Sequence, residues 1–174
     1  MPKRALWIED NAARKYQYWA TRVYVDGRFD LSVAMNATDG MNRMNLSEFD
    51  AVVVDVRLPP GGGVEWIELY NRALRERREP HLGIEMLLRL FSASNSTSRN
   101  SAEYPSLGRA DHANQRHNSP HWVEARRFAI LTVESKFQDA ILDCVRRTGV
   151  RHKEKAAGQS DTVLLDLLVE ICEL

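Results

Sequence analysis

Polar side chains close the short apolar runs of this 174-residue chain, and their types are those that handle phosphoryl groups. Three are carboxylates, one is a hydroxyl and one is an ammonium: Glu9, Asp10, Asp55, Thr132 and Lys155. The carboxyl ends of parallel strands share one edge of a sheet, where open α/β sheets bind their ligands. We therefore expect these five side chains to lie together, in a site suited to a divalent cation and a phosphoryl group.

Each residue type predicts a role in phosphoryl transfer. Hard cations such as Mg²⁺ prefer oxygen ligands, and Glu9 and Asp10, adjacent on a strand-to-loop turn, are suited to be metal ligands together with Asp55. Asp55 ends the most buried run and is the best candidate nucleophile, because a carboxylate can attack phosphorus and form an acyl phosphate. The Lys155 ammonium and the Thr132 hydroxyl would neutralise and hydrogen-bond the phosphoryl oxygens.

Strand-like and helix-like segments alternate along the chain, which favours an α/β fold with a parallel sheet. The expected strands cover residues 5–8, 31–35, 51–55, 128–132 and 150–154. The expected helices cover residues 11–25, 64–78, 84–91, 135–147 and 161–173, and a loop and short helix cover 36–44. Ser160 is placed to be the N-cap of the last helix.

The composition describes a soluble chain. Lys plus Arg and Asp plus Glu number 24 each, so a net charge of zero gives no electrostatic reason to expect nucleic acid or an anionic membrane as partner. No apolar stretch approaches the roughly 20 residues that span a bilayer, and the N-terminal strand leaves no room for a signal peptide. Two cysteines are too few for a disulfide framework. We expect a cytoplasmic protein.

Two stretches interrupt the alternating pattern. Residues 61–81 begin with a Pro- and Gly-rich loop and contain an extra amphipathic helix. Residues 92–126 are rich in Ser, Asn, Arg and His and nearly free of large aliphatic side chains, which favours a flexible loop. His112, His117 and His121 fall in this polar stretch without a cysteine nearby, so loop composition explains them better than a metal site.

The last expected helix is apolar on more than the one stripe needed to pack against a sheet. Two explanations stay open. Either the inserted residues bury its second side, or residues 161–173 present apolar surface to another subunit, which would give a homodimer.

At its polar strand ends the chain resembles the receiver domain of two-component response regulators. In that family an acidic pair follows strand one, as Glu9 and Asp10 do, and a phosphoacceptor Asp ends strand three before an aliphatic-Pro step, as Asp55 does before Leu58-Pro59. Thr or Ser then ends strand four and Lys ends strand five, as Thr132 and Lys155 do. Leu82-Gly83-Ile84-Glu85 is also similar to the start of the family's third helix. The resemblance covers residues 4–60, 82–91 and 127–174.

The resemblance implies a flavodoxin-like, doubly wound sheet of five parallel strands. It also implies Mg²⁺ as cofactor, held by Glu9, Asp10, Asp55 and the backbone carbonyl of Arg57. The implied partners are a histidine kinase or phosphotransfer protein that donates the phosphoryl group and a downstream protein that the sequence does not identify.

The chain departs from the family pattern around strand five. Lys155 is followed by Ala156, where the family has a proline, and His152 stands where the family has an aromatic residue. Residues 151–154 are all polar, so the position of strand five is not fixed by a hydrophobic pattern. Lys153 therefore stays an alternative to Lys155 as the lysine that ends this strand in the family.

Two functions follow from these observations. In the first, residues 1–174 form one receiver-like domain without an output domain, phosphorylated on Asp55 and acting through protein contacts, with no enzymatic activity beyond its own aspartyl phosphate. In the alternative, the fold survives as a phosphorylation-independent scaffold or dimerisation module. An aspartyl-nucleophile phosphohydrolase is disfavoured, because Arg57 stands where such enzymes need a second Asp.

Overall fold

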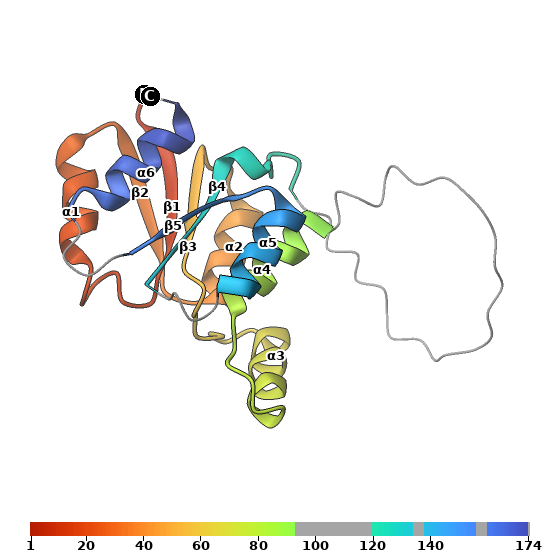
Figure 1. The fold of residues 1–174 in the computed structure, drawn as a ribbon. Coiled ribbons are helices and arrows are strands. Elements are labelled where there is room, and N and C mark those ends of the chain that lie inside the picture. The colour runs from red at the N-terminus through yellow and green to blue at the C-terminus, as the bar shows by residue number, and fades with distance from the viewer. Residues whose placement is uncertain (93–119, 134–137, 156–159, 174) are drawn as a thin grey trace, which may run out of the picture.

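A parallel sheet of five strands in the order β2-β1-β3-β4-β5 runs through the centre of the molecule (Figure 1). The structure, a computed structural model, describes residues 1–92, 120–133, 138–155 and 160–173. The strands are β1 (Lys3–Ile8), β2 (Phe29–Ala34), β3 (Ala51–Val54), β4 (Phe128–Thr132) and β5 (Arg151–Glu154). The predicted doubly wound sheet of five parallel strands is confirmed.

Helices cover both faces of this sheet, with α1 and α6 on one face and α2, α4 and α5 on the other (Figure 1). Their bounds are α1 (Gln17–Asp26), α2 (Ala37–Leu46), α3 (Val64–Arg75), α4 (Leu82–Ser92), α5 (Gln138–Thr148) and α6 (Val163–Cys172). A 3-10 turn, η2 (Ala125–Arg127), leads into β4.

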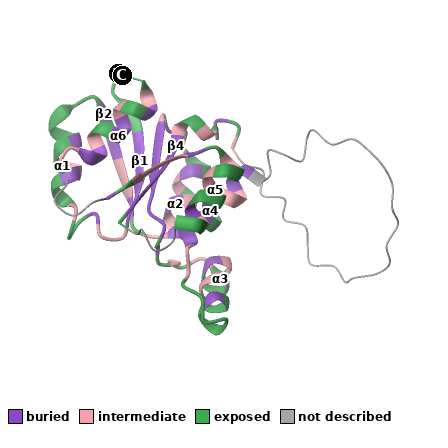
Figure 2. Cartoon of the chain, viewed as in Figure 1, coloured by how far each residue is buried: buried purple, intermediate pink, exposed green. Residues whose placement is uncertain are grey.

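Alternate side chains of the central strands enter two separate cores. Leu6 and Ile8 of β1 pack with Val52 of β3 under α2, α4 and α5. Trp7 and Val53 point the other way and pack under α1 and α6. β3 and residues 5–8 of β1 are buried, as Figure 2 shows for the centre of the sheet, which explains why these segments are continuously apolar rather than alternating.

The polar sequence of β5 is explained by its place at the edge of the sheet. β5 pairs only with β4 among the described strands, in a register that sets His152 opposite Ile130 and Glu154 opposite Thr132. Edge strands are commonly polar, since charged side chains there discourage pairing with a second chain. The strand expected at 150–154 is thus present, although its sequence lacks a hydrophobic pattern.

Several helix boundaries differ from those expected. α1 begins six residues late, because the carbonyl of Asn11 accepts the N–H groups of Lys15 and Tyr16 in a turn that precedes the helix. The prediction that Ser160 is the N-cap of α6 is wrong. That position is taken by Thr162, and Ser160 instead accepts the Thr162 N–H on its hydroxyl at 3.2 Å, in the turn before the helix.

The inserted helix α3 projects from the edge of the molecule in Figure 1, yet it is firmly attached. Trp66 is buried in the core beside α4, and the Arg89 guanidinium lies 4.7 Å from its ring centre. Arg89 also donates a hydrogen bond to Glu65 at 3.0 Å. At the start of the insertion, the Thr38 hydroxyl of α2 donates to the Pro60 carbonyl and accepts the Gly63 N–H.

The long polar stretch lies mostly outside the described residues, which exclude 93–119 and with them His112 and His117. The residues that follow rejoin the core, where Trp122 is buried and stacks on Phe128 with ring centres 5.9 Å apart. His121 is exposed. None of the helices in the described ranges has the length and apolar character needed to cross a bilayer.

The apolar side chains of α6 are used within the chain. Five of them are buried: Val163, Leu164, Leu167, Leu168 and Ile171. The partly buried ones pack on the same cluster, which also contains Trp19 and Val23 of α1. α1 and the sheet therefore cover much of the wide apolar surface that the sequence shows. A homodimer through 161–173 stays a prediction.

Candidate functional site

The carboxyl ends of β1, β3, β4 and β5 bring together the five residues that the sequence singled out. Backbone hydrogen bonds continue past the strands at three of these positions, where the Glu9 N–H donates to the Ala34 carbonyl and Asp55 and Lys155 make similar bonds. The Asp55 N–H donates to the Ile8 carbonyl at 2.9 Å, and the Lys155 N–H donates to the Thr132 carbonyl at 2.7 Å. The main chain at each of these residues is therefore fixed by the same ladder that builds the sheet.

Lys155 crosses the site from the edge strand. Its ammonium donates to Asp55 Oδ1 at 2.9 Å and forms an ion pair with Glu9, and its side chain is only 2% exposed. Lys153, the rival in the sequence, is half-buried and makes no such contact. The geometry therefore places Lys155, and not Lys153, beside the acidic residues.

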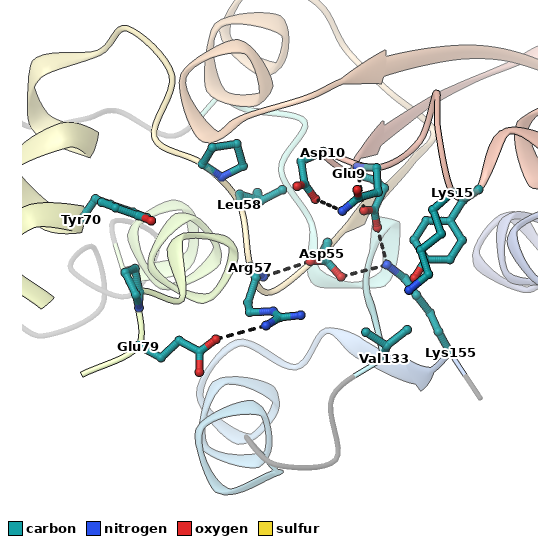
Figure 3. A pocket seen from close by; sticks show the side chains of 14 residues that line it. Glu9, Asp10, Lys15, Asp55, Arg57, Leu58, Tyr70, Glu79, Val133 and Lys155 are labelled. Carbon is teal, nitrogen blue, oxygen red and sulfur yellow. Dashed lines mark hydrogen bonds and ion pairs between the residues drawn. The ribbon is translucent and has the colours of Figure 1, made fainter. Parts of the chain in front are cut away.

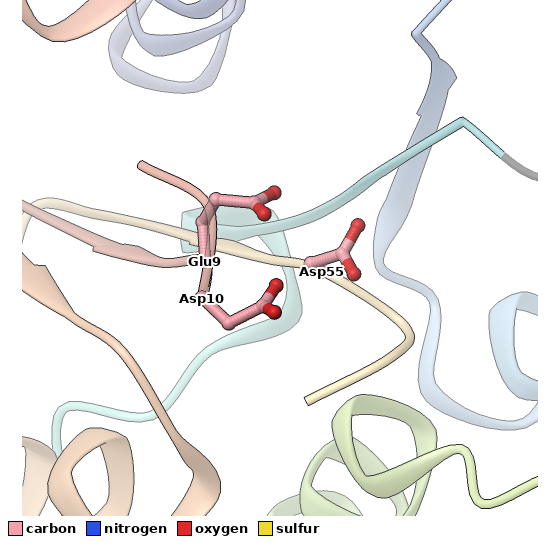
Figure 4. A group of neighbouring side chains, drawn as sticks. All are labelled: Glu9, Asp10 and Asp55. Carbon is pink, nitrogen blue, oxygen red and sulfur yellow. The ribbon is translucent and has the colours of Figure 1, made fainter. Parts of the chain in front are cut away.

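Glu9, Asp10 and Asp55 form one acidic group (Figure 4). Each offers a carboxylate oxygen, and the three oxygens lie within 4.8 Å of one another. That span is comparable to the roughly 4 Å between oxygens on opposite sides of a Mg²⁺ ion. Asn11 orders the first two, since its N–H donates to Glu9 and its side-chain amide donates to Asp10. The residues fit a divalent cation.

Burial changes the acid–base properties of this group. It raises the pKa of Glu9 from 4.5 to about 7, with the nearby Asp55 carboxylate acting in the same direction and Lys155 opposing both. Burial alone would lower the pKa of Lys155, but the carboxylates of Asp55 and Glu9 outweigh it and the pKa is raised. Lys155 is therefore a cation at neutral pH, held between two carboxyl groups.

Asp55 has a partner on each of its carboxylate oxygens. Lys155 contacts Oδ1, and the backbone N–H of Arg57 donates to Oδ2 at 3.0 Å. The Arg57 side chain points away and pairs with Glu79 of the insertion at 3.2 Å. The role of the Arg57 carbonyl as a metal ligand stays a prediction.

α4 approaches the backbone of Asp55 very closely, and this is possible only because Gly83 has no side chain. A Cβ at Gly83 would lie 1.9 Å from the Asp55 carbonyl oxygen. The Gly83 N–H also donates to the Val56 carbonyl at 3.1 Å. The glycine therefore sets how near the first turn of α4 comes to the acidic residue.

Thr132 ends β4 beside this group and is 1% exposed. Within the described ranges its hydroxyl has no hydrogen-bond partner. A buried hydroxyl without a partner costs free energy, so the Thr132 hydroxyl has hydrogen-bonding capacity that the described residues do not use.

An open pocket of about 370 Å³ lies over the acidic group (Figure 3). One side is charged, with Glu9, Asp10, Asp55 and Lys155. The remaining walls come from the loop after β1, the loop after β3, the insertion and the residue after β4: Asn11, Lys15, Tyr16, Arg57, Leu58, Pro59, Tyr70, Glu79, Pro80 and Val133.

Sequence reasoning missed Lys15, Tyr16 and Tyr70 as pocket residues. The first two were assigned to a helix that in fact begins later, and the third belongs to an insertion whose path the sequence does not fix. The one available signal was position in the chain, since both segments directly follow the acidic residues.

Comparison with known proteins gives a clear result only at the level of structure. Neither a protein-family model nor a curated protein matches the sequence. A CheY-like response regulator receiver domain protein from Methanospirillum hungatei JF-1 is 13% identical with a TM-score of 0.55, over 99% of this chain and 95% of that chain. The chemotaxis response regulator CheY4 of Vibrio cholerae is 12% identical with a TM-score of 0.55, over 98% and 99%.

A third similar structure is the signal receiver domain of an HD domain-containing protein from Pseudomonas fluorescens Pf-5. It is 14% identical with a TM-score of 0.55, over 99% of this chain and 88% of that chain. Similarity at such low identity concerns architecture, and all three share it across nearly the whole chain. The strand order, the layers of helices and these matches together show that the chain has the fold of CheY-like response regulator receiver domains.

Proposed function

We propose that this chain is a response-regulator-like receiver that accepts a phosphoryl group on Asp55 with Mg²⁺ bound. The observation that carries the proposal is the grouping of Asp55 with Lys155, Glu9 and Asp10 at one sheet edge, under an open pocket. A carboxylate nucleophile, an ammonium and two further carboxylates are what transfer of a phosphoryl group to an aspartate requires.

In the proposed reaction, a carboxylate oxygen of Asp55 attacks the phosphorus of the donor. A bond forms between that oxygen and phosphorus, and the bond from phosphorus to the leaving group breaks, its electron pair going to the leaving group. Lys155 stays beside the new acyl phosphate and neutralises it, and the Thr132 hydroxyl, which has no partner among the described residues, gains an acceptor. Glu9, Asp10 and Asp55 would hold the Mg²⁺, with the Arg57 carbonyl as a further ligand, and the bound ion would neutralise phosphoryl oxygens.

The proposed phosphodonor is a histidine kinase or phosphotransfer protein, and output goes through contact with a downstream protein. Support comes from α3, which carries Tyr70 into the pocket wall and leaves Val64, Ile67 and Leu74 exposed. A partner that enters the pocket would therefore meet Tyr70 of this helix. We assign the chain as one receiver-like domain that acts in the cytoplasm and is not an enzyme beyond the turnover of its own aspartyl phosphate.

A scaffold without phosphorylation is the second candidate, and one observation favours it. Lys155 already compensates Glu9 and Asp55 in the unphosphorylated chain, so the site is a complete ion-pair network that ties β5 to β1 and β3. Such a network can serve structure alone.

Intact-mass spectrometry separates the two candidates. The full chain is incubated with Mg²⁺ and acetyl phosphate, as wild type, as Asp55→Asn and as Asp30→Asn, which changes an exposed carboxylate on β2. A gain of one phosphoryl mass in wild type and Asp30→Asn, absent from Asp55→Asn, would support the receiver. An adduct in none of them, or in all three, would exclude it and leave the scaffold.

A further inference from the structure

Lys15 is a positive side chain at the acidic pocket that the proposed reaction has not used. It is exposed and lines the pocket alongside Asp10 and Asp55 (Figure 3). Among the described residues, no carboxylate forms an ion pair with it, although four carboxylates line the same pocket. Its ammonium instead contacts the ring of Tyr16, whose centre lies 5.3 Å away.

The loop that carries Lys15 is held in place by the same residue that orders the acidic group. The Asn11 carbonyl accepts the Lys15 N–H at 2.9 Å and the Tyr16 N–H at 3.2 Å, while the Asn11 amides donate to Glu9 and Asp10. The position of the Lys15 main chain is therefore fixed relative to the metal-binding carboxylates.

The ring of Tyr16 is fixed as well. It stacks on Trp19 with ring centres 4.7 Å apart, and Trp19 in turn contacts the buried Trp7. The Lys155 ammonium lies 4.8 Å from the centre of the Tyr16 ring. One aromatic ring thus contacts two ammonium groups, of which Lys155 is buried on Asp55 and Lys15 is open to the pocket.

Phosphorylation would add one negative charge to the site, which the Lys15 ammonium can neutralise. With all three carboxylates ionised, Lys155 and one divalent cation would balance their charge. When Asp55 becomes an acyl phosphate, its single negative charge is replaced by the two charges of a bound phosphoryl dianion. One negative charge is then uncompensated, and Lys15 is the exposed ammonium at the pocket that can meet it.

We propose that Lys15 binds the oxygens of the incoming phosphoryl group and raises the rate at which anionic phosphodonors react with Asp55. This inference rests on the proposed function of Asp55. It concerns the anionic part of the donor, which acetyl phosphate and a phosphorylated protein side chain share.

The test measures initial rates of phosphorylation of the full chain at saturating Mg²⁺ over a range of acetyl phosphate concentrations. The variants are Lys15→Gln, Lys15→Arg and, as the matched control, Arg14→Gln, which removes the same charge from the neighbouring exposed residue outside the pocket wall. We expect Lys15→Gln to lower the second-order rate constant about fivefold at low salt, the size of a favourable exposed charge contact. Lys15→Arg and Arg14→Gln should stay within about twofold of wild type.

The salt dependence of the phosphorylation rate distinguishes a charge contact from a purely structural role of Lys15. Because the contact is exposed, the deficit of Lys15→Gln should shrink toward wild type near 1 M salt, where the screening length is only about 3 Å. The Mg²⁺-induced shift in melting temperature should match wild type, which would show that the acidic group is intact.

The outcomes separate the two levels of the proposal. If wild type is phosphorylated on Asp55 and Lys15→Gln behaves like Arg14→Gln, or its deficit persists at high salt, the role of Lys15 is overturned and the receiver stands. If wild type takes up no phosphoryl group, both fall together.

Discussion

At the scale of single residues, Lys155 has the most demanding position in the molecule. A buried ammonium is tolerated only when its charge is compensated, and here the Glu9 and Asp55 carboxyl groups do so from two other strands. Removing it would leave those groups buried without a counter-charge. The lysine therefore stabilises the folded, unphosphorylated chain in addition to its role in the proposed chemistry.

We expect Lys155→Ala to lower the free energy of unfolding by about 3 kcal/mol at neutral pH, the typical cost of breaking a buried ion pair from one side. Denaturant titration monitored by circular dichroism measures this. Lys153→Ala is the control and should change stability by under about 0.5 kcal/mol, since Lys153 contacts no acidic residue of the site. If Lys155→Ala changed the free energy of unfolding as little as Lys153→Ala, the buried ion pairs would contribute nothing to stability.

The types of the five site residues made the acidic site predictable from the sequence, but the pocket wall that contains Lys15 was not predicted. Glu9, Asp10 and Asp55 could be found because acidic residues directly follow apolar runs, and a parallel sheet collects such positions at one edge. Lys15 could not be found, because its place depends on where α1 begins. That boundary is set by hydrogen bonds to the Asn11 carbonyl rather than by the hydrophobic pattern.

At the scale of elements, the first turn of α4 is positioned by the lack of a side chain at Gly83. The helix must move if a Cβ is added, since the atom that it would meet is the backbone oxygen of Asp55 rather than a flexible side chain. The sequence Leu82-Gly83-Ile84 therefore does more than start a helix: it lets that helix lie against the acidic strand end.

Gly83→Ala should lower the free energy of unfolding by about 2 kcal/mol, because the added methyl forces α4 away from β3. It should also weaken Mg²⁺ binding, since the backbone of Asp55 moves with it. Chemical denaturation and isothermal titration with Mg²⁺ measure the two effects. Gly62→Ala is the matched control, as nothing lies within 4 Å of a Cβ there. A Gly83→Ala variant as stable as Gly62→Ala would contradict the close approach.

The elements differ in how well the sequence predicted them, and the reason is burial. β3 and β4 were found because strands covered on both faces are continuously apolar. The start of α6 was misplaced, because Ser160 has the chemistry of an N-cap but its hydroxyl is used one turn earlier. β5 was found only by its position in the order of segments, since an edge strand carries no hydrophobic signal.

At the scale of the whole molecule, the acidic site couples stability to pH. The pKa of Glu9 is about 7 in the folded chain against an ordinary value of 4.5. Between those values the folded state holds a proton that the unfolded state has lost. The contribution of Glu9 is therefore fully favourable below about pH 4.5 and is lost as the pH rises toward 7.

Mg²⁺ should have the opposite pH dependence, because it binds the ionised form of Glu9 and so stabilises the folded state more as the pH rises. We expect the affinity for Mg²⁺ to fall about tenfold between pH 8 and pH 6, as a proton competes for the carboxylate with a pKa near 7. The shift in melting temperature on adding Mg²⁺, measured across that range, reports it. The Glu9→Gln variant should bind more weakly and show little pH dependence. A wild-type shift of equal size at both pH values would count against a role for Glu9 in the metal site.

The aromatic residues behind the pocket have a further consequence, which is optical. Trp19 stacks on Tyr16, whose ring contacts the Lys155 ammonium, and Trp7 packs behind Trp19. Trp66 and Trp122 lie in the core on the opposite face of the sheet. Indole emission responds to nearby charge. With Trp66 and Trp122 replaced by phenylalanine, the remaining indole fluorescence would come from Trp7 and Trp19, which connect to the acidic site through Tyr16 and Lys155. The chain thus contains its own spectroscopic probe of what binds there, with no label attached.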